Sequence, residues 1–131
     1  MHHYAVTPPM APLVERLLGT PYEQMHCRDA IAWMFREGFG LDLATDSAAV
    51  TRNFCEVWYY GNAEDPLELI MPWDLVIYAH DPAWPVSSHV GVMIDETRFL
   101  HARNGGIGVV VERFRRWRPK LVQVARYKVL M

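Results

Sequence analysis

Residues 89–102 read HVGVMIDETRFLHA, and this stretch decides the fold. Two largely apolar runs flank the dipeptide Asp95-Glu96, which is the pattern of two strands joined by a tight turn. A histidine begins the first run and another lies near the end of the second, twelve positions apart. The stretch therefore predicts a β-hairpin that carries two imidazole side chains.

Further apolar runs on both sides of this hairpin predict a larger sheet. Residues 74–79 have the composition of a buried strand, residues 107–112 follow a turn at Gly105-Gly106, and residues 121–127 close the sheet. Each run is short and is bounded by turn residues, as expected for strands. The second half of the chain therefore predicts a meander of neighbouring strands.

The N-terminal part has helical spacing instead. A short helix opened by prolines ends at Gly19, and apolar residues recur at helical spacing over about residues 26–37. Asp46 or Ser47 could cap a third helix that runs to Gly61. Helices first and strands later predict an α+β fold, in which N-terminal helices pack on an antiparallel sheet of about five strands.

Length and composition predict one packed domain. The chain has 131 residues, of which 51% are hydrophobic, enough for a single buried core. No run of about 18 apolar residues is present, so we expect no membrane span. The N-terminus lacks the basic region and apolar core of a secretion signal, so we expect a protein made in the cytoplasm.

Charge is unevenly distributed behind a net value of −2. Residues 38–96 hold ten acidic side chains and one basic, whereas residues 97–131 hold nine basic and one acidic, Glu112. Five of the basic side chains gather between Arg113 and Lys120. Two interpretations remain open: solvated faces of opposite charge, or a basic surface that docks on an anionic partner. No nucleic-acid-binding motif accompanies the arginines, so we expect no specific nucleic-acid recognition.

Cys27 stands at the start of the second predicted helix. The positive end of a helix dipole favours a thiolate, and a neighbouring imidazole favours it further. A thiol, a histidine base and a polar group that orients the histidine form the triad of nucleophilic catalysis. The chain offers Cys27, His89 and His101 in that order, which is the order of papain-like hydrolases. The residues therefore predict acyl transfer through a cysteine.

The other cysteine, Cys55, has no such partners and is expected to be a small buried hydrophobe. The two cysteines lie 28 positions apart, which indicates no disulfide framework. No set of His, Cys, Asp and Glu residues has the spacing of metal ligands. We therefore expect neither a metal nor another cofactor.

Five short pieces of the sequence match one known family in order and spacing. They are Leu18-Gly19-Thr20-Pro21-Tyr22, Cys27 with the helix end Phe39-Gly40-Leu41-Asp42-Leu43, Trp73-Asp74-Leu75-Val76, His89-Val90-Gly91-Val92 and Phe99-Leu100-His101-Ala102. Through them the chain resembles the NlpC-type cysteine peptidases, a papain-like family that cuts peptide bonds in bacterial cell-wall peptidoglycan. The resemblance implies one papain-like domain over residues 1–131, with a core at about 13–127.

The resemblance also implies a role for each site residue. Cys27 would be the nucleophile, His89 the general base, and His101 the group that orients His89. Tyr22 would lie near the substrate carbonyl, where its phenol and the Cys27 backbone N–H stabilise an oxyanion. We expect the Cys27 sulfur within about 4 Å of a His89 ring nitrogen.

Two positions depart from the family pattern, which usually has Asp before the cysteine and a small residue two places after it. Here His26 and Asp29 occupy those positions. Repulsion from the Asp29 carboxylate would disfavour the thiolate unless Arg28 or His26 compensates. His26 could also act as a second titrating neighbour of the thiol.

The resemblance finally implies a setting. Compact forms without wall-binding domains are found in tailed bacteriophages and gene-transfer particles, so we expect a virion or phage-like tail location and a tail-tip hub protein as partner. Asp29 keeps a second hypothesis open, a structural tail protein that has lost turnover. A third, an acyltransferase or amidase like lecithin:retinol acyltransferase, is disfavoured because that permuted group places its histidine before the cysteine.

Overall fold

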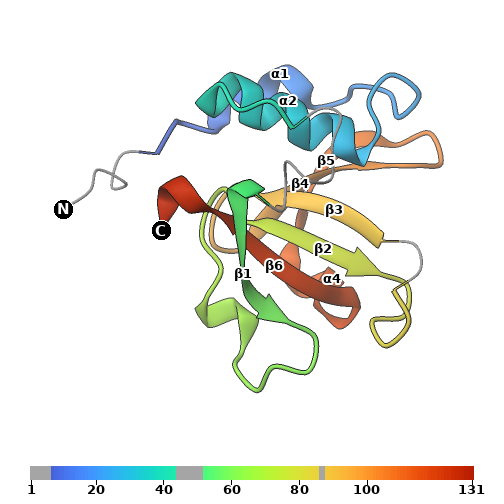
Figure 1. Ribbon diagram of the computed structural model, residues 1–131. Helices are drawn as coiled ribbons and strands as arrows, with labels where there is room; N and C mark the ends of the chain where they lie inside the picture. The colour runs from blue at the N-terminus through green and yellow to red at the C-terminus, as the bar shows by residue number, and fades with distance from the viewer. Residues whose placement is uncertain (1–6, 44–51, 86–87) are drawn as a thin grey trace.

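The computed structural model describes residues 7–43, 52–85 and 88–131. Helices α1 (Ala11–Leu17) and α2 (Cys27–Phe39) come first in the chain and lie over one face of a sheet (Figure 1). A short helix, α4 (Phe114–Trp117), follows the fifth strand. In the described ranges no helix is long and apolar enough to cross a membrane.

The sheet has six strands in the order β1-β6-β2-β3-β4-β5, and every pair of neighbours is antiparallel. Strands β2 to β5 form the predicted meander, and β6 returns to lie between β1 and β2. The predicted α+β class, with N-terminal helices packed on an antiparallel sheet, is confirmed, with six strands where about five were expected. The strands are β1 (Phe54–Tyr59), β2 (Leu75–Ala79), β3 (Ser88–Met93), β4 (Arg98–Arg103), β5 (Gly108–Arg113) and β6 (Leu121–Tyr127).

The prediction of a third helix up to Gly61 is wrong over residues 54–59, which form strand β1. The buried side chains there are Phe54 and Trp58, four positions apart. A spacing of four fits one face of a helix and, in a regular strand, one face as well, so periodicity could not decide. In β1 a bulge between Glu56 and Trp58 places the two side chains in different cores, Phe54 on the helix side and Trp58 on the other. Antiparallel pairing with β6 along one side makes this segment a strand. The expected caps, Asp46 and Ser47, lie outside the described residues.

Helix α2 begins at Cys27 and buries the face formed by its apolar residues. It continues through Gly38 and stops at Gly40, whose φ of +69° is the left-handed conformation of a helix end. A Cβ at position 38 would lie only 2.6 Å from the Trp73 ring. Glycine at this position therefore lets the indole pack directly against the helix.

Two hydrophobic cores cover the two faces of the sheet. The core on the helix side joins α1 and α2 to inward residues of the strands, among them Val92, Leu100 and Val109. The core on the other face contains Tyr78, Met93, Phe99 and Phe114, with Trp117 of α4 packed against it. Because side chains alternate along a strand, β3 and β4 contribute to both cores.

A buried ion pair joins β2 to β6. Asp74 is fully buried, and the Arg126 guanidinium donates to both of its carboxylate oxygens, each at 2.8 Å. The second oxygen also accepts from the Met71 backbone N–H at 2.9 Å. Burial raises the pKa of Asp74, although these hydrogen bonds and the Arg126 charge act against that rise. The carboxylate therefore depends on Arg126 to remain charged in the core.

Candidate active site

Cys27 is the first residue of α2, so its backbone N–H belongs to the helix end that has no intrahelical partner. The Asp29 carboxylate accepts a hydrogen bond from the His26 backbone N–H at 3.0 Å, which closes the first helical turn. A carboxylate in the first turn also complements the helix dipole. Asp29 thus has a structural role at the helix start. Arg28 forms no ion pair with it within the described part of the chain.

The segment that leads to Cys27 is fixed to the outer strand of the sheet. The Gly19 N–H donates to the Val109 carbonyl at 3.0 Å, and the Val109 N–H donates to the Thr20 carbonyl at 2.9 Å. Gly108 has a φ of +79°, and a Cβ there would lie 2.2 Å from the Thr20 oxygen. Only glycine admits this approach.

Tyr22 continues from this anchored segment toward the helix start. Its ring stacks on the ring of His26, with centroids 4.5 Å apart and planes 22° from parallel. The stacking therefore fixes Tyr22 against His26, the residue that precedes Cys27 at the helix cap.

The two histidines predicted from the hairpin do meet. His89 Nε2 and His101 Nδ1 are 2.6 Å apart, which is a short hydrogen bond between the rings. The β3–β4 ladder pairs Val92 with Leu100 and Met93 with Phe99, and in the described residues it extends no further toward the histidines. The hydrogen bond between the two histidine side chains therefore links β3 and β4 beyond the end of their backbone ladder.

Helix α2 packs against both histidine-bearing strands, β3 and β4. The rings of His89 and His101, however, lie on the other face of these strands, beside Phe99 and Trp117 of the second core. Within the described residues the Cys27 thiol takes part in no hydrogen bond or ion pair, and its side chain is half-buried. The expected approach of the sulfur to His89 stays a prediction.

Three residues at the site were missed by the sequence reasoning. Glu112 Oε2 lies 3.4 Å from His101 Nε2, on the side of the ring away from His89. Arg103 donates to Glu112 Oε1 at 2.7 Å, and the indole N–H of Trp117 donates to Oε2. One signal was available, because Glu112 is the single acid of residues 97–131. Its contact with His101 depends on strand register, which composition does not reveal.

Aromatic rings enclose the histidine pair. The Trp117 ring stacks on His89 at 5.9 Å between centroids and meets His101 edge-on at 4.9 Å. Phe99 lies 4.5 Å from the His101 ring. These apolar neighbours restrict both imidazoles to the observed orientation and keep water from His101, which is fully buried.

Burial lowers the pKa of both histidines. For His89 the positive charge of Arg103 adds to this effect, while Glu112 opposes it. For His101 burial and the charge of His89 bring the pKa to about 4, again against the attraction of Glu112. Both rings are therefore neutral near pH 7, which is the state that a general base requires.

The same shifts predict how stability depends on pH. An unfolded histidine takes up a proton near pH 6.5, whereas folded His101 does so near about 4, so the unfolded chain binds more protons between these values. We expect the free energy of unfolding to fall as pH decreases through this window, by up to about 1.4 kcal/mol per pH unit for each histidine. Urea denaturation at several pH values measures this directly.

The matched control for this measurement is His101→Gln. The variant lacks one titrating group, so its stability should depend less steeply on pH than that of the parent, and the carboxylates common to both chains cancel in the comparison. Equal slopes for parent and variant between pH 6.5 and about 4 would show that His101 is not held neutral by the fold.

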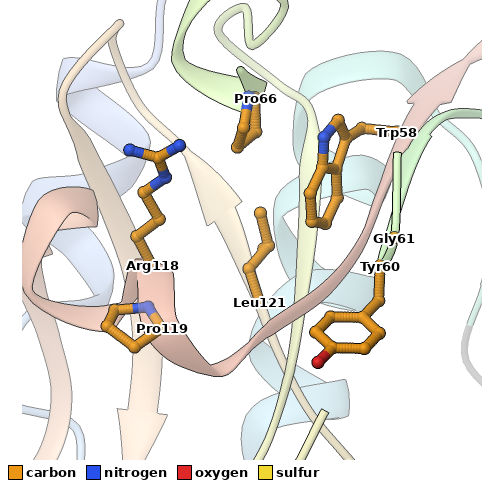
Figure 2. A pocket seen from close by; sticks show the side chains of 7 residues that line it. All are labelled: Trp58, Tyr60, Gly61, Pro66, Arg118, Pro119 and Leu121. Atoms are coloured by element: carbon orange, nitrogen blue, oxygen red, sulfur yellow. The ribbon is translucent and has the colours of Figure 1, made fainter. Parts of the chain in front are cut away.

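A separate pocket of about 420 Å³ lies between β1, the 3-10 turn Pro66–Glu68 and the start of β6 (Figure 2). Trp58 and Leu121 supply buried apolar walls, and Arg118 lies at the rim, where it pairs with Asp65 at 3.0 Å. None of the residues predicted for catalysis lines it. The lining residues are Trp58, Tyr60, Gly61, Pro66, Arg118, Pro119 and Leu121.

Metal binding has no support in the described ranges. There, no group of three or more His, Cys, Asp or Glu residues is arranged to hold a metal ion. The histidine pair has one adjacent carboxylate, which two donors already occupy. The site as described is thus built from hydrogen bonds between side chains.

Comparison with known proteins identifies solved structures with a similar fold. The sequence matches no protein-family model and no curated protein. Solved structures do match: an NlpC/P60 family protein from Bacillus cereus has a TM-score of 0.69 and 21% identity over 93% of this chain. NlpC1 from Trichomonas vaginalis has a TM-score of 0.62 and 21% identity over 89% of this chain.

A third structure is the NlpC/p60 domain of the peptidoglycan hydrolase SagA, with a TM-score of 0.60 and 16% identity over 95% of this chain. This chain covers 98% of that domain but only 41% and 42% of the Bacillus and Trichomonas chains. The helix-on-sheet arrangement is thus that of papain-like domains. More narrowly, the fold is of the NlpC/P60 type.

Proposed function

We propose that this protein is a cysteine peptidase that cleaves peptide bonds in bacterial cell-wall peptidoglycan. The observation that carries the proposal is the 2.6 Å hydrogen bond between His89 and His101, the two histidines that follow Cys27 in the order expected of the triad. The NlpC/P60-type fold adds support, since one structural neighbour is named as a peptidoglycan hydrolase. Cys27, His89 and His101 are the triad of this proposal.

In the first half of the reaction, His89 takes the proton of the Cys27 thiol and the sulfur attacks the peptide carbonyl carbon. The negative charge that develops on the carbonyl oxygen needs donors. The Cys27 backbone N–H is free for this role at the helix end, and the Tyr22 phenol is a second candidate. The C–N bond then breaks, and protonated His89 gives its proton to the leaving amine.

The second half releases the acyl group from sulfur. A water molecule gives a proton to His89 as its oxygen attacks the thioester carbonyl, and the C–S bond breaks as the thiolate leaves. The thiolate recovers a proton from His89, and the new carboxylic acid loses its proton to solvent while the released amine gains one, which leaves a carboxylate and an ammonium group. Atoms and charges balance, and the only new ends are one amine and one carboxylate.

The test is digestion of purified peptidoglycan by the parent protein. Peptide cleavage creates new amino groups and leaves the glycan intact, so labelling of free amines followed by mass spectrometry should reveal new N-termini without new reducing sugar ends. Products with only new reducing ends would indicate a glycosidase and would contradict the proposal. The masses of the fragments also identify the bond that is cut.

One observation favours a second candidate, a structural tail protein that retains the fold without turnover. The Cys27 thiol takes part in no hydrogen bond in the described part of the chain, so the nucleophile and its base are not joined there. Complete inactivity of folded protein on several peptidoglycan types, together with incorporation into particles, would favour this candidate over the peptidase.

We further propose that the protein docks on an acidic segment of a tail-tip hub protein through its basic segment, residues 113–120. Arg113, Arg115, Arg116, Arg118 and Lys120 are all exposed there. Within the described residues Arg118 is the member that has an acidic partner, Asp65, so the other four charges are uncompensated. Such a cluster attracts an anionic surface and loses affinity in salt.

The docking proposal predicts that the chain copurifies with phage-like particles and that the double variant Arg115→Glu/Arg116→Glu is lost from them. Lys128→Glu, a single reversal outside the basic segment, serves as control and should remain bound. Mass spectrometry of washed particles measures occupancy, and increasing salt should release the parent chain. Absence of the parent from purified particles would rule out this role.

A further inference from the structure

One nitrogen of the buried histidine pair lacks a hydrogen bond. His101 is fully buried, and its Nδ1 is engaged with His89. Its Nε2 forms no hydrogen bond within the described part of the chain. A buried polar group without a hydrogen bond destabilises the folded state by about 1–3 kcal/mol, so the nearest polar group is the candidate partner of this nitrogen. The group that it faces, at 3.4 Å, is the Glu112 carboxylate.

This carboxylate is held in place from two other directions. Arg103 donates to one of its oxygens at 2.7 Å, and the Trp117 indole N–H donates to the other. Burial acts to raise the pKa of Glu112, but the hydrogen bonds from Trp117 and Arg103 outweigh it, and the net pKa is lowered. Glu112 is therefore ionised near neutral pH, and an ionised carboxylate can only accept hydrogen bonds.

Strand register places Glu112 on the correct side of the sheet. His101 is opposite Val110 in the β4–β5 ladder, and Glu112 is two residues further along β5, opposite Phe99. Residues two apart share a face, so Glu112 is the diagonal neighbour of His101. A slip of one residue would turn the carboxylate to the helix side of the sheet.

We propose that Glu112 is a positioning residue that sets the tautomers of both histidines. An acceptor beside His101 Nε2 requires the proton on that nitrogen, which leaves Nδ1 with a lone pair. That lone pair accepts from His89 Nε2–H, so His89 presents an unprotonated Nδ1. In this order His89 Nε2–H donates to His101 Nδ1, and the His101 Nε2–H faces the Glu112 carboxylate.

The final link, from His89 Nδ1 to the Cys27 thiol, rests on the proposed function, whereas the tautomers do not. With the opposite tautomers the His89 proton would sit on Nδ1, and the ring could not accept the thiol proton without first transferring its own. Glu112 therefore affects His89 only indirectly, through His101, and contacts neither the sulfur nor the substrate.

Nuclear magnetic resonance of ¹⁵N-labelled protein tests the tautomers directly. Long-range ¹H–¹⁵N correlations of the imidazole rings distinguish a protonated from an unprotonated nitrogen. We expect protonated Nε2 and unprotonated Nδ1 in both His89 and His101 of the parent at neutral pH. A proton on His101 Nδ1 in the parent would overturn the inference, and this result needs no variant.

Glu112→Gln provides the second arm, with Glu56→Gln on β1 as matched control. A glutamine offers one acceptor oxygen to Arg103 and Trp117 and places no negative charge opposite His101 Nε2, so we expect mixed tautomers at His101. The pKa of His101 should also fall, because the Glu112 charge now raises it. Unchanged ring signals and an unchanged His101 pKa in Glu112→Gln would overturn the inference.

Cleavage assays separate this inference from the proposed function. If the parent cleaves peptidoglycan, Glu112→Gln should lower kcat roughly 10- to 100-fold with little change in KM, since only proton transfer is impaired. An unchanged kcat would overturn the inference. A parent that cleaves nothing but shows the expected tautomers, lost in the variant, would refute the peptidase proposal and support the role of Glu112.

Discussion

Cys27→Ala is expected to abolish peptidoglycan cleavage, with a loss of at least about 10³-fold in kcat/KM relative to the parent. The reason is that alanine offers no atom that can form the thioester, and water cannot replace the sulfur in the same geometry. The side chain is half-buried at the first position of α2, so the fold should tolerate the change. Release of new amino termini from purified peptidoglycan measures the rate.

The control for this experiment is Cys55→Ala. Cys55 is also a free, half-buried cysteine, but it lies on β1, at the other end of the strand order from β4 and β5. The Cys55→Ala variant should cleave at the parental rate. A thiol-alkylating reagent should inactivate both the parent and Cys55→Ala. If Cys27→Ala kept the parental rate, the nucleophile would have to be another residue.

Arg126→Met should lower the free energy of unfolding by about 3–5 kcal/mol, the range seen when one partner of a buried ion pair is removed. Asp74 is fully buried and Arg126 is 15% exposed, so the carboxylate that remains has no solvent to replace the guanidinium. The Leu69 carbonyl loses its donor as well, at 2.7 Å in the parent. Urea denaturation followed by tryptophan fluorescence measures the change.

Arg98→Met is the matched control. Arg98 pairs with Asp95 at the same distance of 2.8 Å, but the two side chains are 51% and 39% exposed, so the expected loss is below about 1 kcal/mol. A further check uses pH: without Arg126 the Asp74 carboxyl should protonate more readily, so the deficit of Arg126→Met should shrink in acid. If Arg126→Met and Arg98→Met lowered the free energy of unfolding equally, burial would not be the reason why the Asp74–Arg126 pair matters.

Much of the fold could be predicted because each later strand carries its own local signal. The hairpin of β3 and β4 was evident from two apolar runs around Asp95-Glu96, and α2 from its helical spacing. The first strand could not be recognised in this way, since the four-residue spacing of Phe54 and Trp58 fits a helix, and a bulge in β1 interrupts the alternation of a strand. Its identity depends on pairing with β6, a partner more than sixty positions away.

The candidate site shows the same division between local and long-range information. The family resemblance implied that His101 orients His89, and the two rings do form a hydrogen bond. Glu112 and Trp117 were missed, because they reach His101 only through the β4–β5 register and the fold of α4 back onto the sheet. Their residue types alone indicated a solvated charge and a packing aromatic.

The hydrogen bonds between Val109 and the Gly19-Thr20 loop also affect association between chains. β5 is an outer strand, and the free backbone groups of an outer strand can pair with another molecule. The loop occupies both groups of Val109 and so covers part of this edge. Detachment of the loop would release the segment before Cys27 and expose the edge in one event. Loss of activity and the onset of aggregation would then have a common origin.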